Sequence, residues 1–151
     1  MNKWQQRWVN MAHSVSEWSK DPNTKIGVVL VNDDRKQILS VGFNGIPRGV
    51  DDKPEERSSR ENGEKYYWYA HAERNAIYNC AYFGLSPAGA TMYMACGMPC
   101  TDCAIAIIQA GIKEILIKDT PPTGEPNSKW DAHATRSRIM LTEAGVNVIV
   151  Y

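Results

Sequence analysis

The sequence has no long apolar run, no excess of charge of one sign and few cysteines. A membrane span needs about 20 consecutive apolar residues, and no run approaches that length. The segment Met1–Gln6 also lacks the apolar character of a signal peptide. Seventeen basic residues balance seventeen acidic ones, so no overall field attracts a polynucleotide or an anionic membrane. These absences favour a small-molecule partner, with no membrane and no nucleic acid.

Cysteine occurs at four positions, and two of them, Cys100 and Cys103, form a C-x-x-C pair. Cys80 and Cys96 have no obvious partner and are read as small buried hydrophobic residues. This pattern favours a reduced, cytoplasmic compartment over a disulfide framework. With 151 residues, 43% of them hydrophobic, the chain has the size of one domain, residues 1–151.

What the sequence does contain is a split set of metal-ligand residues. His71 and Glu73 stand in a His-Ala-Glu triplet, and Cys100 and Cys103 follow later in Pro-Cys-Thr-Asp-Cys. One His and two Cys supply three ligands for zinc and leave one coordination place open, where a water can be activated. Glu73 remains to handle protons. The set therefore predicts a catalytic zinc site.

Both halves of this set fall at predicted helix starts, where free N–H groups and the helix dipole favour thiolates. The i, i+3 spacing of Cys100 and Cys103 places both sulfurs on one face of the first turn. Two other interpretations stay open. The C-x-x-C pair alone is compatible with a redox site, and Cys96 or Cys80 is a candidate fourth ligand of a closed structural zinc. The remaining histidines, at positions 13 and 133, are read as surface or packing residues.

Hydrophobic periodicity and turn signals predict the element order αββ followed by αβ three times. The predicted helices span residues 2–19, 71–83, 100–110 and 131–144, and the predicted strands span 25–32, 37–43, 91–95, 114–118 and 146–150. The short connection at 33–36 makes the first two strands antiparallel, whereas the helix before the last strand makes the last two parallel. We therefore expect an α/β fold of α-β-α layers, with a mixed five-stranded sheet and helices on both faces.

Three further features are predicted along the chain. The first helix should lay a stripe that includes Trp4, Trp8, Met11 and Trp18 on the core. Residues 44–69 should form a long irregular loop, which we expect to be functional because it leads into the His-Ala-Glu triplet. A Pro-rich loop is expected at 120–126.

The H-x-E and P-C-x-x-C motifs form the signature of the zinc deaminases, with the Glu as general acid and base. Four stretches in the same order, 19–24, 42–49, 71–77 and 107–113, resemble the deoxycytidylate (dCMP) deaminase family. The resemblance implies a cytidine deaminase-like fold and hydrolysis of dCMP to dUMP and ammonia, which feeds dTMP synthesis. It further implies Zn²⁺ on His71, Cys100 and Cys103, with Glu73 moving the protons.

The resemblance also implies substrate and effector contacts. The backbone N–H of Ala72 would hold the pyrimidine O2, Asn44 would reach the sugar, and the loop of Asn23, Thr24 and Lys25 would face the nucleotide. Members of the family are typically homohexamers that dCTP activates and dTTP inhibits, generally with Mg²⁺. The corresponding effector region here comprises Gly42, Phe43, Asn44, Gly45 and Arg48. Phe43 stands where the family usually has Tyr, so an effector contact through that hydroxyl is missing.

Two rival functions remain at this point. A polynucleotide deaminase, such as a tRNA adenosine deaminase, shares the zinc set but normally carries a basic stripe near the site. A non-catalytic nucleotide-binding module with structural zinc is the other rival. Glu73 separates it from an enzyme, because such a module has no use for a carboxylate beside an open zinc site.

Overall fold

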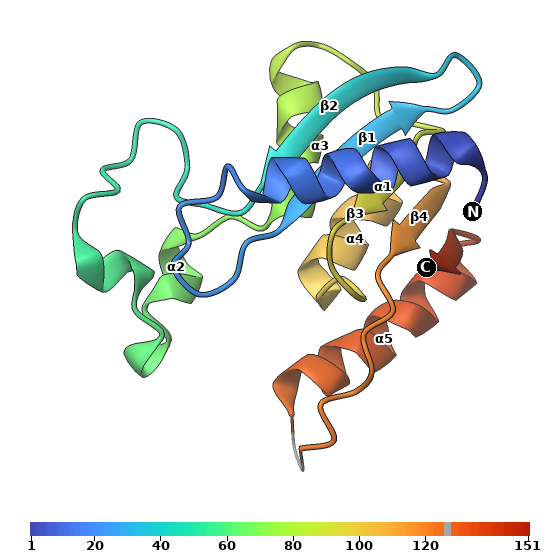
Figure 1. Cartoon of the computed structure of the whole chain (residues 1–151). Coiled ribbons are helices and arrows are strands. Elements are labelled where there is room, and N and C mark those ends of the chain that lie inside the picture. The colour runs from blue at the N-terminus through green and yellow to red at the C-terminus, as the bar shows by residue number, and fades with distance from the viewer. Residues whose placement is uncertain (126–127) are drawn as a thin grey trace.

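A computed structural model of the chain describes residues 1–125 and 128–151 (Figure 1). Pro126, the last residue of the predicted Pro-rich loop, lies outside them. The five strands are β1 Gly27–Asn32, β2 Gln37–Phe43, β3 Thr91–Met94, β4 Glu114–Ile117 and β5 Asn147–Val150. The helices are α1 Lys3–Ser16, α2 Lys65–Trp68, α3 Ala72–Tyr82, α4 Thr101–Gln109 and α5 Lys129–Glu143, with 3-10 turns η1 Glu55–Ser58 and η2 Glu61–Gly63. Within the described part of the chain, none of the helices combines the length and apolarity needed to cross a membrane.

The strands form one mixed sheet in the order β2-β1-β3-β4-β5. β1 pairs antiparallel with β2 and with β3, while β3 with β4 and β4 with β5 are parallel. The four residues between β1 and β2 suffice for a hairpin, whereas α5 carries the chain back before β5. Both predictions of strand direction are therefore confirmed.

Helices cover both faces of the sheet, as predicted. Val29, Val31 and Tyr93 pack with α1 on one face, and Val28 and Met92 pack with α3, α4 and α5 on the other. In Figure 1, α1 crosses in front of the sheet and α3 and α4 lie behind it. Successive side chains of β1 point to opposite faces of the sheet, and both faces are covered by helices. This is why the strand is apolar at successive positions and is buried on both faces.

The predicted Trp-rich stripe on α1 is partly wrong. Trp8 is buried, together with Val9, Ala12 and Val15, but Trp4, Met11 and Trp18 are exposed. The helix ends at Ser16, so Trp18 is no longer part of its helical face. Trp4 lies at the edge of the buried stripe and stacks on Trp8, with ring centroids 5.4 Å apart. In α1, therefore, only the centre of the predicted stripe reaches the core.

Residues 44–69 are less irregular than predicted, because they contain η1, η2 and α2. This segment extends to the left of the sheet in Figure 1. A buried ion pair between Lys65 of α2 and Asp21 holds it against the loop before β1. A backbone pair between Gly45 and Ala70 joins its two ends. The segment is thereby fixed beside the start of α3.

β2 and α3 pack backbone against backbone at Gly42. A Cβ placed on Gly42 would collide with the main chain of Ala72 and Ala76, so this position accepts no larger side chain. The close approach fixes the first turn of α3 relative to the sheet, and His71 directly precedes that turn.

Candidate active site

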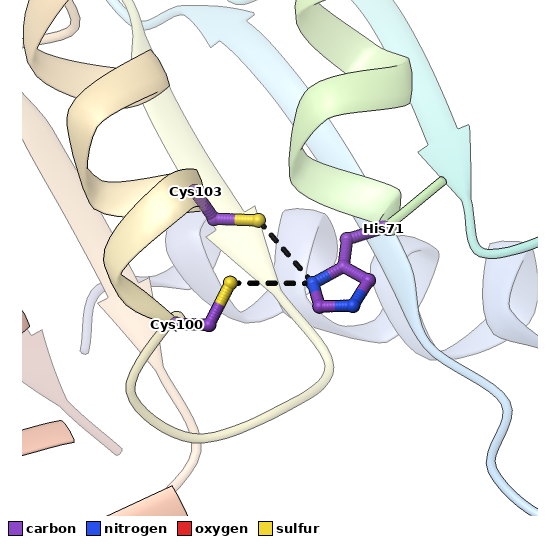
Figure 2. Close-up of side chains that lie close together, drawn as sticks. All are labelled: His71, Cys100 and Cys103. Carbon is purple, nitrogen blue, oxygen red and sulfur yellow. Dashed lines mark hydrogen bonds between the residues drawn. The ribbon is translucent and has the colours of Figure 1, made fainter. Parts of the chain in front are cut away.

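His71, Cys100 and Cys103 converge at the starts of two neighbouring helices (Figure 2). His71 Nδ1 lies 3.4 Å from Cys100 Sγ and 3.4 Å from Cys103 Sγ. The three potential ligand atoms all lie within 4.8 Å of one another. The structure therefore brings together the two halves of the set that are far apart in the sequence.

Local sequence explains how these side chains come to face one another. His71 is the N-cap of α3 and Cys100 the N-cap of α4, and neither uses its own side chain as a cap. Cys103 lies in the first turn of α4, on the same face as Cys100. Both helices thus present their N-terminal ends, where positive partial charge accumulates, towards the sulfurs.

The spacing fits a tetrahedral zinc ion. Zn–N bonds of about 2.0 Å and Zn–S bonds of about 2.3 Å separate nitrogen from sulfur by about 3.5 Å, close to the 3.4 Å observed. Cys80 is fully buried in the core and donates to Ser40 Oγ at 3.4 Å. Neither Cys80 nor Cys96 belongs to the ligand group formed by the described residues. The geometry therefore favours a site with three protein ligands over a closed site with four.

The electrostatics of the site favour a thiolate at Cys100. Hydrogen bonding from Cys103, and then from His71, lowers the pKa of the Cys100 thiol to about 3, although burial opposes this shift. The hydrogen bond that His71 Nδ1 donates to the Cys100 sulfur, with burial opposing, raises the pKa of His71. A thiolate is the form in which cysteine binds zinc. A C-x-x-C redox pair does not need a histidine in contact with both of its sulfurs, so this contact favours the zinc site over a redox site.

Glu73 lies beside these ligands and has no hydrogen-bond partner for Oε2 among the described residues. Its side chain is 3% exposed, and it lines the same cavity as His71 and Cys100. Burial raises the pKa of its carboxyl, and the His71 charge opposes this shift. An unpaired polar atom in the interior is costly and calls for an explanation. A carboxylate poised to exchange a proton with a bound molecule provides one.

The cavity over these residues measures about 280 Å³, close to the smaller ligand pockets of proteins. Much of its wall is apolar or aromatic. Tyr66 comes from α2, Met98 from the loop before α4, and Trp130 from α5. The rings of Tyr66 and Trp130 approach each other to 6.1 Å between centroids. Such a wall suits a flat heterocyclic ring.

Four polar residues complete the cavity: Thr24, Asn44, Arg60 and Lys65. The sequence indicated the first two but gave no signal for the other two. Arg60 and Lys65 lie in the segment that was expected to be irregular, and Trp130 lies far along the chain. Their approach to the cavity depends on tertiary packing, which a local sequence pattern does not predict.

Only some of the predicted substrate residues line the cavity. Thr24 and Asn44 line the cavity, whereas Asn23 lines a separate hollow and Lys25 pairs with Glu17 at 3.2 Å. Ala72 is fully buried at the start of α3. Substrate contacts by these residues remain predictions.

Asn44 also has a structural role that the sequence did not indicate. Its Nδ2 donates to Asp21 Oδ2 at 2.9 Å and to the Thr24 carbonyl at 2.8 Å, and its Oδ1 accepts from the Ile26 N–H at 2.8 Å. Burial would raise the pKa of Asp21, but hydrogen bonds from Lys65 and from backbone N–H groups lower it overall. This network positions the Thr24 loop at the cavity.

The predicted effector residues lie on both sides of the end of β2. Gly42 and Asn44 are buried, while Phe43 is partly exposed and packs edge-on against Trp18, at 6.1 Å between centroids. Arg48 contacts Asn79 Oδ1 and lies over the Tyr82 ring. Phe43 and Arg48 are therefore the accessible members of the set, and effector binding remains a prediction.

Comparisons with known proteins agree with this site. The family model of the cytidine and deoxycytidylate deaminase zinc-binding region matches residues 2–118. A protein of Aliivibrio fischeri, described as an uncharacterized deaminase in the luxG 3′ region, is 36% identical over 148 residues, covering 98% of this chain and 93% of that protein. Human deoxycytidylate deaminase is 36% identical over 148 residues, covering 95% of this chain and 77% of the human protein.

The fold is also found among solved structures. The dCMP deaminase of the cyanophage S-TIM5, in complex with dCMP and dUMP, has a TM-score of 0.76 to this structure and 24% sequence identity. The match covers 100% of this chain and 99% of the cyanophage chain. At that identity the match establishes the fold, including the mixed sheet with parallel last strands.

Proposed function

Because this chain belongs to the cytidine and deoxycytidylate deaminase zinc-binding family, we propose that it hydrolyses dCMP to dUMP and ammonia. The observation that carries the proposal is the buried Glu73 carboxylate, whose Oε2 is unpaired among the described residues, directly beside the His71, Cys100 and Cys103 group. The relatives named deoxycytidylate deaminase support dCMP as the substrate. Ammonia release from a panel of cytosine substrates and tRNA tests the proposal.

His71, Cys100 and Cys103 would hold the zinc ion, which supplies Lewis acidity that makes water a stronger acid and so a nucleophile near neutral pH. Glu73 would accept the proton of the attacking water and deliver it to N3 of the ring while C4 becomes tetrahedral. Glu73 would then move a second proton to the departing amino group. Its burial keeps bulk water from competing for these protons.

The walls of the cavity suit the remaining parts of the nucleotide. Tyr66 and Trp130 would flank the pyrimidine or the sugar, and the N–H of Ala72, in the first turn of α3, would donate to O2. Asn44 lines the cavity and would contact the sugar through the second lone pair of Oδ1.

Arg60 is our candidate for binding the 5′-phosphate. Its side chain is exposed, lines the cavity and donates one N–H to Thr24 Oγ1 at 2.6 Å, so the other guanidinium donors remain for an anion.

Replacing Arg60 by Ala should raise KM for dCMP by about 10-fold or more, since hydrogen bonds to charged groups contribute about 1.5–3 kcal/mol. The KM for deoxycytidine, which lacks the phosphate, should be unchanged in the Arg60→Ala protein.

Steady-state kinetics with both substrates measure this effect. Arg57→Ala is a matched control, because Arg57 lies on the same segment but stacks over Trp68 at 4.0 Å. An unchanged KM for dCMP in the Arg60→Ala protein would remove Arg60 from the phosphate site.

Regulation by nucleotide triphosphates is a further part of the proposal, supported by the family resemblance of residues 42–49. With Mg²⁺ and subsaturating dCMP, dCTP should raise the rate and dTTP should lower it. Because Phe43 lacks the hydroxyl of the usual Tyr, Phe43→Tyr should lower the dCTP concentration needed for activation. Rates that do not respond to either nucleotide, in both proteins, would refute the regulatory part alone.

The resemblance also supports a homohexamer, a single catalytic domain over residues 1–151 and a supply of dUMP for dTMP synthesis. A cytoplasmic location is supported by the cysteines, because none of the four forms a disulfide. The proposed chemistry depends neither on the assembly nor on the location.

A further inference from the structure

The first turn of α4 carries both cysteines of the candidate zinc site, yet it lacks an N-terminal cap of its own. Cys100 occupies the N-cap position, and its side chain makes no capping hydrogen bond. By contrast, Asn2 and Ser128 cap α1 and α5 in the usual way. An N-cap side chain accepts from the second or third N–H of its helix, so the first N–H, that of Thr101, needs an acceptor from elsewhere.

His133 of α5 supplies that acceptor. Its Nδ1 lies 3.3 Å from the Thr101 N–H and 2.9 Å from Thr101 Oγ1. Accepting the backbone N–H requires the tautomer that carries its proton on Nε2. Thr101 is the first residue of α4 and stands between the two cysteines. The imidazole therefore holds the turn from which both sulfurs project.

The same imidazole also contacts the wall of the cavity. The rings of Trp130 and His133 lie 6.0 Å apart between centroids, and Trp130 lines the cavity together with Cys100. α5 lies beyond residues 2–118, which the family model matches, so that match assigns no role to His133. One side chain thus links the last helix to both the cysteine turn and the aromatic wall.

We propose that His133 is a positioning residue that caps α4 from α5 and fixes Cys100 and Cys103 in the geometry that zinc requires. The proposal rests on the proposed zinc site, but not on the identity of the substrate. Groups that orient metal ligands without touching the metal ion typically contribute about 10- to 100-fold to metal affinity. His133 should contribute within this range.

Three substitutions separate capping from mere packing. In His133→Asn the amide oxygen can take the place of Nδ1, whereas in His133→Gln the amide stands about one bond further out, near the place of Nε2. His133→Ala removes the acceptor. We expect Ala and Gln to weaken zinc binding about 10-fold or more, and Asn to restore it. His13→Ala, on α1, is the matched histidine control and should bind zinc like the wild type.

Zinc affinity is measured by competition with a chelator, without substrate, and ligand geometry by the sulfur-to-metal absorption of the Co²⁺-substituted proteins. Wild-type affinity and an unchanged Co²⁺ spectrum in the folded Ala protein would overturn the proposal. If the His133→Ala protein does not fold, the comparison of His133→Asn with His133→Gln decides. Equal zinc affinities of these two proteins would overturn the proposal. A wild-type protein that binds no zinc would instead refute the proposed function and this inference together.

Discussion

Replacing Glu73 by Gln should leave zinc binding intact and slow the turnover of dCMP by about 10²- to 10⁴-fold, the range that a general acid and base contributes. The amide preserves the size of the side chain in a site where it is 3% exposed. It cannot accept the proton of the attacking water, nor return one to the ring. Binding and chemistry should therefore separate in this variant.

Zinc content and dUMP formation, measured on the same sample, provide the test. Glu64→Gln is a suitable control, because Glu64 lies close in sequence, directly before α2, but accepts from Trp68 Nε1 at 2.7 Å. The control should retain near wild-type turnover. Wild-type turnover by the Glu73→Gln protein would remove Glu73 from the mechanism, whereas loss of zinc would give it a structural role instead.

Replacing His71 by Ala should abolish both zinc binding and turnover, and the loss of rate should exceed the roughly 10⁴-fold upper range for general acid–base catalysis. His71 Nδ1 lies 3.4 Å from each sulfur, so its removal leaves two ligands on a single helical turn. Metal binding contributes free energy to the folded state. The variant should therefore melt at the temperature of chelator-treated wild-type protein.

Zinc stoichiometry after dialysis and thermal unfolding with and without chelator measure these effects. His13→Ala should keep one zinc ion and full activity, because His13 lies on α1, away from the ligand group. One equivalent of tightly bound zinc in the His71→Ala protein would contradict the assignment of His71 as a ligand.

The sequence predicted most of the fold because its signals are local. The hairpin between β1 and β2 follows from a four-residue connection, and the parallel β5 follows from the helix before it. The cysteine and histidine positions at helix starts follow from the same periodicity. The metal-ligand pattern needed only residue types and spacing, and the structure brings the three ligand atoms within 4.8 Å of one another.

What the sequence did not predict depends on contacts between distant segments. Asp21 and Lys65, which fix the loop beside the cavity, are 44 residues apart and belong to no common pattern. α2 has four residues, too few for a periodic signal. His133 was expected on the surface or in packing, and its contact with Thr101 appears only once α5 is placed against α4. Positioning residues of this kind are set by tertiary structure.

The most direct test is ammonia release by the zinc-loaded protein from dCMP, deoxycytidine, dCTP and tRNA, with the Glu73→Gln protein as the blank. We predict one dUMP for each ammonia released from dCMP, a much lower rate with deoxycytidine, and no inosine in tRNA. If dCMP is inert while tRNA is deaminated, the cavity serves a polynucleotide and the proposed function is wrong.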